Sequence, residues 1–191
     1  MDTVNIIHDD RFFDRLPPLI KELEEYKIGY TVWAACIDKK NVLENITESF
    51  RRIVQDAKDK GLKRVIIAED DLTLTSSGAW DYFLKNEPDQ YDVYIGGSYL
   101  IDNRCKYEPP IVRVDSWVGN HLIMVNERYY DTWLSSKPDG HIDTEQSNRG
   151  EFYVCFPYVA LQRPAMSANN TGQMVNYNSI LENLPQYIYK G

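Results

Sequence analysis

Apolar segments alternate with amphipathic segments along the first half of the chain, and this alternation restricts the fold more than any other feature. Residues 4–7, 30–37, 65–68 and 91–95 are rich in β-branched, aromatic and small apolar side chains, as buried strands are. Helices are predicted between the first three, beginning near Asp14 and at Asn41. When helices join successive strands, the sheet is mainly parallel and covered on both faces. The sequence therefore predicts an α/β fold with a mainly parallel sheet and helices on both faces.

The two predicted helices have recognisable ends and faces. Pro17 and Pro18 suit the first turn of the first helix, because proline is favoured there. Asn41 and Glu44 have the spacing of a capping box, and Gly61 is expected to end the second helix. The buried face of that helix is an apolar stripe at helical spacing: Val42, Ile46, Phe50, Ile53, Val54 and Ala57.

Patterns in the second half of the chain are shorter. A serine at position 76 or 77 is expected to cap a helix that contains Trp80. Asn126 is expected to cap a helix that runs through Leu134. The remaining predicted elements are strands at 117–125 and 152–161 and short helices at 143–146 and 180–184.

Length, composition and charge restrict the class of protein. With 191 residues, 43% of them apolar and 26% charged, the chain can bury one core and is not disordered. No repeat or linker composition divides it, so we expect one domain over residues 1–170 and a tail over residues 171–191 that is a candidate lid. The formal net charge is -8, and a negative surface repels phosphate polymers. Nucleic acid is therefore not an expected partner.

The sequence also bears on location and redox state. No apolar run approaches the ~18 to 20 residues that cross a bilayer, and the first residues lack the basic start of a signal peptide. Cys36, Cys105 and Cys155 are odd in number and widely spaced, which suits neither a disulfide framework nor a zinc site. These features predict a soluble cytoplasmic protein without a transmembrane segment. Its cysteines are expected to be reduced, with Cys36 and Cys155 in core strands.

Three consecutive carboxylates, Glu69, Asp70 and Asp71, directly follow the apolar strand at 65–68. Ligands bind at the carboxyl ends of strands in open α/β sheets, and here that edge is negatively charged. Mutual repulsion raises the pKa of each carboxyl unless a cation stabilises the ionised forms. Oxygen ligands select hard ions such as Mg²⁺ or Mn²⁺. Because alternate strand residues point the same way, we expect Glu69 and Asp71 to face one side and Asp70 the other.

Several functions use such a cluster, and a solvated acidic turn is the purely structural interpretation. A metal at a strand end assists transfer from a nucleotide diphosphate, phosphate hydrolysis and nucleolytic cleavage. The sequence contains no GxxxxGK[ST] loop, which argues against an NTPase. A phosphatase that attacks through aspartate requires that residue at the first acidic position, where this chain has Glu69.

Four segments together match the pattern of a known enzyme class. Residues 65–71 pair an apolar strand with a Glu-Asp-Asp variant of a DxD motif, and residues 119–126 match the strand-then-helix segment that follows it. Ile142-Asp143 matches an Ile-Asp pair, and residues 156–162 with Ser167 match a Pro and Gln-Ser ending. In these residues the chain resembles nucleotide-sugar glycosyltransferases of the GT-A type, most closely the family 25 enzymes that build lipooligosaccharide. The resemblance implies a single GT-A-like, Rossmann-like domain.

The resemblance also implies roles for individual residues. Glu69 and Asp71 take the flanking DxD positions and hold Mn²⁺ or Mg²⁺, while Asp70 contacts the ribose or the sugar. In GT-A enzymes the loop after the first strand holds the nucleotide, and Arg11 or Arg15 is placed to meet a phosphate. The donor-binding candidates in that loop are His8, Asp9 and Arg11.

Transfer with inversion requires a carboxylate that takes the proton of the acceptor hydroxyl. Asp143 is the candidate, because it lies at a predicted helix start and matches the Ile-Asp pair; the alternative is that it only caps this helix with Gln146. As a cap it is expected to keep one carboxylate oxygen free. His141 is a candidate further metal ligand or a plain surface residue, and Trp117 is a candidate sugar platform or a core residue.

Two functions from different classes remain open. The first is a metal-dependent hexosyltransferase that uses a nucleotide diphosphate sugar, preferably a UDP-sugar, and a saccharide acceptor. The second is a catalytically silent module of the same fold that binds a sugar nucleotide or a glycan, since His8 and Asp9 replace the family's Asn-Leu. A metal phosphohydrolase is a third and weaker alternative. The oligomeric state does not follow from the sequence.

Overall fold

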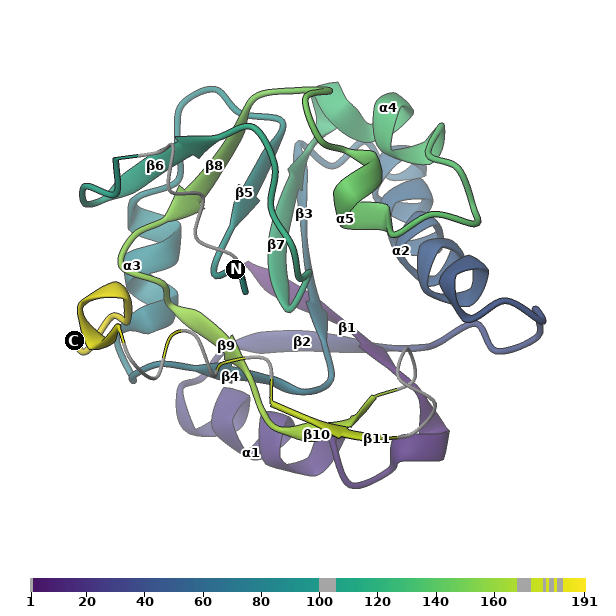
Figure 1. The fold of residues 1–191 in the computed structure, drawn as a ribbon, viewed down its shortest axis with the longest axis horizontal. Coiled ribbons are helices and arrows are strands. Elements are labelled where there is room, and N and C mark those ends of the chain that lie inside the picture. Colours follow the sequence, from purple (N-terminus) through teal and green to yellow (C-terminus); the bar gives the residue numbers. More distant parts are fainter. Residues whose placement is uncertain (1, 100–105, 168–172, 177, 179–180, 182–183) are drawn as a thin grey trace.

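A computed structural model of the chain describes residues 2–99, 106–167, 173–176, 178, 181 and 184–191 (Figure 1). Its centre is a seven-stranded sheet with the strand order β2-β1-β3-β7-β5-β8-β6. Of these strands, all but β6 and β7 run in one direction, which confirms the mainly parallel sheet. The strands are β1 (Thr3–His8), β2 (Gly29–Ala34), β3 (Arg64–Glu69), β5 (Val93–Ile95), β6 (Ile111–Val114), β7 (Leu122–Asn126) and β8 (Phe152–Cys155).

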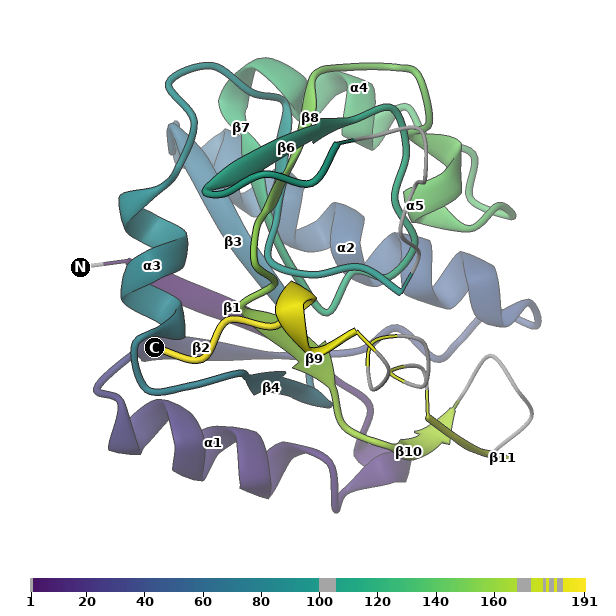
Figure 2. The same cartoon turned by 60° about the vertical axis from the view of Figure 1, so that its left-hand side comes forward.

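Helices cover both faces of the sheet, as the alternation predicted (Figure 1, Figure 2). One face carries α2 (Val42–Asp59), α4 (Tyr130–Leu134) and α5 (Ile142–Glu145), and the other carries α1 (Leu16–Glu25) and α3 (Ala79–Lys85). Each layer has its own apolar core, with Ile67 and Phe50 in one and Ile66 and Leu19 in the other. Neighbouring residues of β3 thus face opposite layers, as the strand period of two requires.

The helices predicted in the first half of the chain are confirmed. α1 has its prolines in the first turn, and its buried residues are Leu19 and Leu23. The Asn41 side chain caps α2 by accepting the Leu43 amide at 2.9 Å. Gly61 follows α2 with φ of +64°, a conformation that glycine adopts without steric cost.

The strand predicted at 30–37 is shorter and more exposed than expected. β2 forms the edge of the sheet beside β1, and its Val32 is 42% exposed. Cys36 lies beyond it, half-buried in a loop, so its predicted place in a core strand is wrong, whereas Cys155 is buried in β8. Strand propensity does not separate an edge strand from a central one, which explains the error.

Several boundaries in the second half differ from the prediction. β7 begins at Leu122 instead of at 117, and the strand predicted at 152–161 is divided into β8 and β9 (Ala160–Gln162) around Pro157. Proline has no amide hydrogen and interrupts a ladder there. Gly78, and not a serine, is the N-cap of α3. Asn126 does cap a helical segment, which starts as η2 (Glu127–Tyr129) and continues as α4.

Short strands outside the main sheet complete the fold. β4 (Leu72–Leu74) pairs with β9, and β10 (Ala165–Ser167) pairs with β11 (Gln173–Val175). Two further 3-10 helices are η1 (Asp10–Phe12) and η3 (Pro185–Tyr187). Near the C-terminus, the Tyr189 amide donates to the Tyr158 carbonyl at 2.9 Å. The lid role of the tail stays a prediction, and Cys105 and most of the helix predicted at 180–184 lie outside the described residues.

In the described part of the chain, no helix combines the length and the apolar character that crossing a bilayer requires.

Candidate active site

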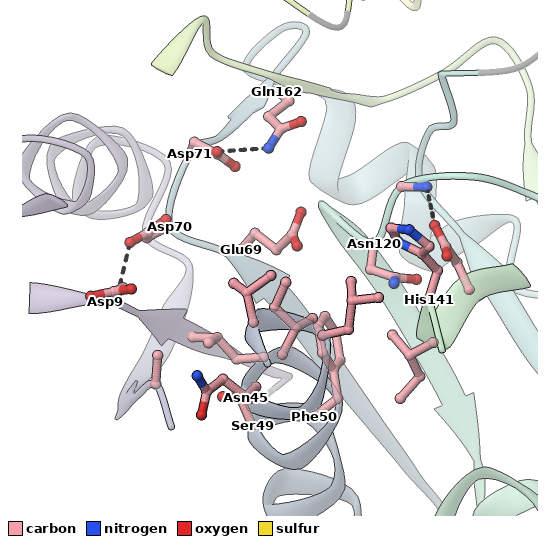
Figure 3. Close-up of a pocket in the computed structure, with 18 of the residues that line it drawn as sticks. Asp9, Asn45, Ser49, Phe50, Glu69, Asp70, Asp71, Asn120, His141 and Gln162 are labelled. Carbon is pink, nitrogen blue, oxygen red and sulfur yellow. Dashed lines mark hydrogen bonds between the residues drawn. The ribbon is translucent and has the colours of Figure 1, made fainter. Parts of the chain in front are cut away.

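A cavity of about 570 Å³ opens at the carboxyl ends of β1, β2 and β3 (Figure 3). Because these strands are parallel neighbours, the residues at their ends meet at one edge of the sheet, among them Asp9, Ala35 and Glu69. β7 runs the opposite way, so Gly119 and Asn120, which precede it, reach the same edge. The ligand-binding edge expected for an open α/β sheet is thus hollow in this protein.

All of the predicted site residues except His8 and Trp117 line this cavity. His8 is the last residue of β1 and alternates with Ile7, so its side chain points away from the wall that Ile7 forms. It is 8% exposed, and its Nδ1 lies 2.7 Å from Asp70 Oδ2. His8 thus holds Asp70 from outside the cavity lining, and its contact with the donor stays a prediction.

Asp70 and Asp71 are held together by one guanidinium group. Arg15 Nη2 lies 2.7 Å from Asp70 Oδ1 and also forms a short contact with Asp71 Oδ2. Gln162 Nε2 donates to the same oxygen of Asp71 at 2.6 Å (Figure 3). The expected division of the carboxylates between two sides is wrong for this pair, because β3 ends at Glu69 and the next two residues form a turn.

The acidic cluster has less positive charge around it than its carboxylates require. Burial and the neighbouring Asp71 raise the pKa of Glu69 to about 8. Burial also raises the pKa of Asp71 to about 6, against the opposing effect of Arg15. Asp71 Oδ1 is buried and has no hydrogen-bond partner among the described residues. An additional cation at this edge would lower the raised pKa values of Glu69 and Asp71 and would give Asp71 Oδ1 a partner.

Asp70 differs from its neighbours because more groups stabilise its charge. Burial raises its pKa, while Arg15 and His8 oppose the shift. The Asp9 amide also donates to its Oδ2, at 3.3 Å (Figure 3). Asp70 therefore joins the end of β1 to the acidic turn.

Asp9 and Arg11 form a compact pair on the same loop. The Asp9 side chain accepts the Arg11 amide at 3.0 Å and caps η1, and Arg11 Nε donates to it at 2.9 Å. The hydrogen bond from Arg11 lowers the pKa of Asp9. Both residues line the cavity, and Arg11 is exposed, which leaves its guanidinium accessible to an anionic ligand.

Asp143 lies in the first turn of α5, with His141 as the N-cap. Its Oδ2 accepts the Gly119 amide at 2.8 Å, and its Oδ1 accepts the Thr144 amide at 2.8 Å. The expectation of one free carboxylate oxygen is therefore wrong, although each oxygen keeps a second lone pair. Its charge contributes to the raised pKa of Glu69 across the cavity.

His141 and Trp117 match the structural alternatives that the sequence left open for them, a surface residue and a core residue. Figure 3 places His141 across the cavity from Asp71, and His141 is exposed. Within the described ranges, no three His, Cys, Asp or Glu side chains are arranged to hold a metal, so His141 does not join Glu69 and Asp71 in a ligand set. Trp117 is 2% exposed, packs edge-on against Phe152 and donates to Asn120, as a core residue does.

Polar residues of α2 also reach the cavity, and the sequence reasoning missed them. Asn45 and Ser49 line it beside Phe50 (Figure 3). The Ser49 hydroxyl donates to the Asn45 carbonyl at 2.7 Å, and the Cys36 amide donates to Ser49 Oγ at 2.8 Å. Asn41, Asn45 and Ser49 follow one another at intervals of four residues, which places them on one face of α2 beside the apolar stripe. This polar spacing is visible in the sequence.

Comparison with known proteins gives a likeness of fold. No family model and no curated protein sequence matches the chain. Among solved structures, A197 from STIV is similar with a TM-score of 0.50 and 16% identity over 81% of both chains. A glycosyltransferase involved in the glycosylation of the major capsid of PBCV-1 has a TM-score of 0.44 and 9% identity over 69% of this chain and 62% of its own.

A Drosophila β1,4-galactosyltransferase 7 mutant in complex with manganese, UDP-Gal and xylobiose has a TM-score of 0.40 and 16% identity over 69% of this chain and 51% of its own. The chain thus spans most of A197 but about half of this galactosyltransferase chain. At these identities the likeness to A197 concerns the fold alone, and the reaction has to be inferred from the residues of the cavity.

Proposed function

We propose that the protein is a metal-dependent glycosyltransferase that moves a hexose, with inversion, from a nucleotide diphosphate sugar to a saccharide acceptor. The observation that carries this proposal is the gathering of Glu69, Asp71 and Asp143 around one cavity. The transfer requires charge stabilisation at the departing diphosphate and a carboxylate that takes the proton of the acceptor. We expect a UDP-sugar as the donor, and the resemblance to family 25 favours a role in lipopolysaccharide assembly.

The residues at the end of β3 suit a hard divalent cation. The unpartnered Asp71 Oδ1 and the Glu69 carboxyl would hold Mn²⁺ or Mg²⁺. Gln162 and Arg15 bond the other oxygen of Asp71, and such outer partners commonly orient a ligand. Two carboxylates leave further positions of the ion to phosphate oxygens and water. When bound, the ion would neutralise charge on the departing diphosphate.

The remaining cavity residues suit the donor. The cavity volume of about 570 Å³ lies within the range of roughly 300 to 1,000 Å³ typical of small-molecule sites. Arg11 would meet a phosphate, while Asp9 and Asp70 would contact the ribose or the sugar. Asn45 and Ser49 lie on the α2 wall, which also has apolar residues and suits a ring with a few hydrogen-bonding groups.

Asp143 would accept the proton of the attacking hydroxyl. Its two hydrogen bonds from backbone amides fix the position of the carboxylate that would act as the general base. The second lone pair of either oxygen would receive the acceptor hydroxyl. The carboxylate would thus be held in position by the fold before the substrate arrives.

A catalytically silent sugar-nucleotide or glycan-binding module is the second candidate. Arg15 already pairs with two of the three carboxylates, which favours a site that is stable without a metal. A module of this kind would bind the nucleotide sugar and leave its glycosidic bond intact.

Turnover separates the two candidates. Hexoses linked to UDP, GDP and CMP are offered with Mn²⁺ and a panel of saccharide acceptors, and the product is identified by mass spectrometry. We expect transfer from one donor class, with loss of at least about 100-fold in Asp71→Asn because an ion ligand is removed. Asp131→Asn, at a surface salt bridge with Lys58, is the matched control.

Two results would contradict the transferase. If Mn²⁺ and UDP raise the melting temperature but no sugar moves to any acceptor, the binding module is the better description. If neither Mn²⁺ nor Mg²⁺ binds in the presence of UDP, the metal-dependent function is wrong.

A further inference from the structure

Arg15 places a positive charge inside the acidic cluster. The residue precedes α1, its side chain is 13% exposed, and its guanidinium carbon lies 5.5 Å from the centre of the Phe12 ring. One nitrogen, Nη2, contacts both Asp70 and Asp71. Burial acts to lower the pKa of Arg15, but the three carboxylates of the cluster outweigh it and raise the pKa, so Arg15 stays charged at every physiological pH.

A divalent cation at Asp71 would have this guanidinium as its neighbour. Asp71 would use Oδ1 for the ion while Oδ2 stays bonded to Arg15, so two positive groups would share one carboxylate. Charges of like sign repel strongly when they are partly buried and close together. Arg15 therefore supports the carboxylates when no ion is bound, and it weakens the binding of an ion that arrives alone.

A diphosphate would change this balance. Arg15 lines the cavity, and guanidinium groups bind phosphate oxygens with strong charge-assisted hydrogen bonds. Phosphate oxygens also complete the coordination of Mg²⁺ and Mn²⁺. With a nucleotide diphosphate present, the guanidinium and the ion would each gain a negative partner, and the repulsion between them would be screened.

We propose that Arg15 is a resident counter-ion that competes with the divalent cation, so that the ion binds weakly alone and tightly only together with a nucleotide diphosphate. The proposal rests on the metal site of the proposed function and adds its order of assembly. It assigns Arg15 a positioning role toward the acidic cluster and a direct role toward the diphosphate.

Calorimetry with Mn²⁺, in the absence and presence of UDP, tests the proposal. We expect Arg15→Gln to bind Mn²⁺ alone at least about tenfold more tightly than the wild type, because the competing charge is gone. UDP should raise the affinity for Mn²⁺ less in Arg15→Gln than in the wild type, and by linkage Mn²⁺ should raise the affinity for UDP less. Arg15→Lys keeps the charge and should resemble the wild type with Mn²⁺ alone.

Arg128 provides a matched control. Its guanidinium also joins two carboxylates, with Nε 2.7 Å from Asp92 and Nη2 2.5 Å from Glu151. Arg128→Gln therefore makes the same change of charge and breaks the same kind of pair away from the cavity. Its affinity for Mn²⁺ should equal that of the wild type.

The outcomes separate this inference from the proposed function. If the wild type binds Mn²⁺ with UDP but Arg15→Gln binds Mn²⁺ no more tightly, the counter-ion role is wrong and the metal site stands. If Arg15→Gln alone binds Mn²⁺, with no binding to the wild type even with UDP, the competition between Arg15 and the ion is supported. Tight binding in the presence of the diphosphate is then wrong, and so is the metal-dependent function. If no variant binds the ion, both are wrong.

The melting temperature of Arg15→Gln gives a second test of the competition between Arg15 and the divalent cation. Removal of Arg15 leaves two buried carboxylates without their cation, so Arg15→Gln is expected to melt at a lower temperature in the presence of a chelator. Millimolar Mn²⁺ should restore the melting temperature. A variant that stays unfolded with Mn²⁺ would contradict the competition between the two cations for this site.

Discussion

The Gly119 amide donates a 2.8 Å hydrogen bond to Asp143 Oδ2, which joins the segment before β7 to the first turn of α5. Both residues line the cavity. Gly119 has φ of +99°, a conformation that side-chain-bearing residues rarely adopt. A glycine in a special conformation thus fixes the carboxylate that we propose as the general base.

Asp143→Asn tests the role of that carboxylate. The amide keeps one oxygen for the Gly119 hydrogen bond but cannot accept a proton from the acceptor, so we expect transfer to fall by about 100-fold or more. The affinity for Mn²⁺ with UDP should change little, whereas the melting temperature should fall because the new amide nitrogen cannot accept the Thr144 amide. Asp131→Asn is the control, because Asp131 lies on α4 and forms an exposed salt bridge with Lys58. Equal rates for the wild type and Asp143→Asn would exclude Asp143 as the base.

Gly119→Ala tests whether the loop conformation matters for the fold. A Cβ at this position would lie 2.8 Å from the Tyr99 ring and 3.1 Å from His121 Nδ1, in addition to the strain of the positive φ. We expect the free energy of unfolding to fall by at least about 2 kcal/mol, measured in urea.

Gly61→Ala is the reference for this substitution. Its φ is +64°, and no atom lies within 4 Å of the added Cβ, so backbone strain of about 1 kcal/mol is the expected cost. If the two alanine variants lose equal stability, the contacts with Tyr99 and His121 are not tight in solution.

The sequence was most informative where local patterns decide structure. The apolar segment 65–68 and the capped stripe after Asn41 predicted β3 and α2, because burial on one or two faces leaves a periodic signal. The acidic residues after β3 and Asp143 in α5 were predicted as site residues, and the structure brings them to one cavity.

The largest errors at the site concern relations that span long distances in the chain. The partners of Asp70 and Asp71 are His8, Arg15 and Gln162, from elements that no local pattern connects to β3. The same limit applies to β2, whose composition suits a central strand although it lies at the edge. Side-chain partners and strand order depend on tertiary packing, which periodicity does not encode.

The buried His121 ring makes the free energy of unfolding depend on pH. Its ring is 1% exposed, and burial lowers its pKa to about 4, although the ring also has a hydrogen bond with the Ala160 carbonyl. Since the unfolded value is about 6.5, the unfolded chain binds more protons between these two values. The stabilising contribution of His121 is present above pH 6.5 and is lost as the pH falls through about 4.

His121→Gln isolates this contribution. The wild type should lose about 2 kcal/mol more of its free energy of unfolding than the variant between pH 7 and pH 5, measured by urea denaturation. Other groups titrate in both proteins and cancel in the comparison. Parallel stability curves would show that His121 is protonated in the folded state at pH 5.

Glu69 gives the opposite dependence on pH. Burial and Asp71 raise its pKa to about 8 from an ordinary value of 4.5, so the folded protein binds its proton more tightly than the unfolded chain does. The contribution of Glu69 to the free energy of unfolding is therefore complete below pH 4.5 and is lost as the pH rises through about 8. Glu69→Gln removes the titration and keeps the shape of the side chain.

We expect Glu69→Gln to be more stable than the wild type at pH 9, with a difference that shrinks toward pH 5, when urea unfolding is followed in the presence of a chelator. Mn²⁺ with UDP should reverse the order at pH 9, because the ionised Glu69 gains a cation and glutamine does not. Glu127→Gln, which alters an exposed salt bridge with Lys63, should follow the wild type at each pH. If the difference between Glu69→Gln and the wild type is the same at pH 5 and pH 9, Glu69 is ionised throughout that range. The acidic edge of β3 would then already hold enough positive charge without a metal ion.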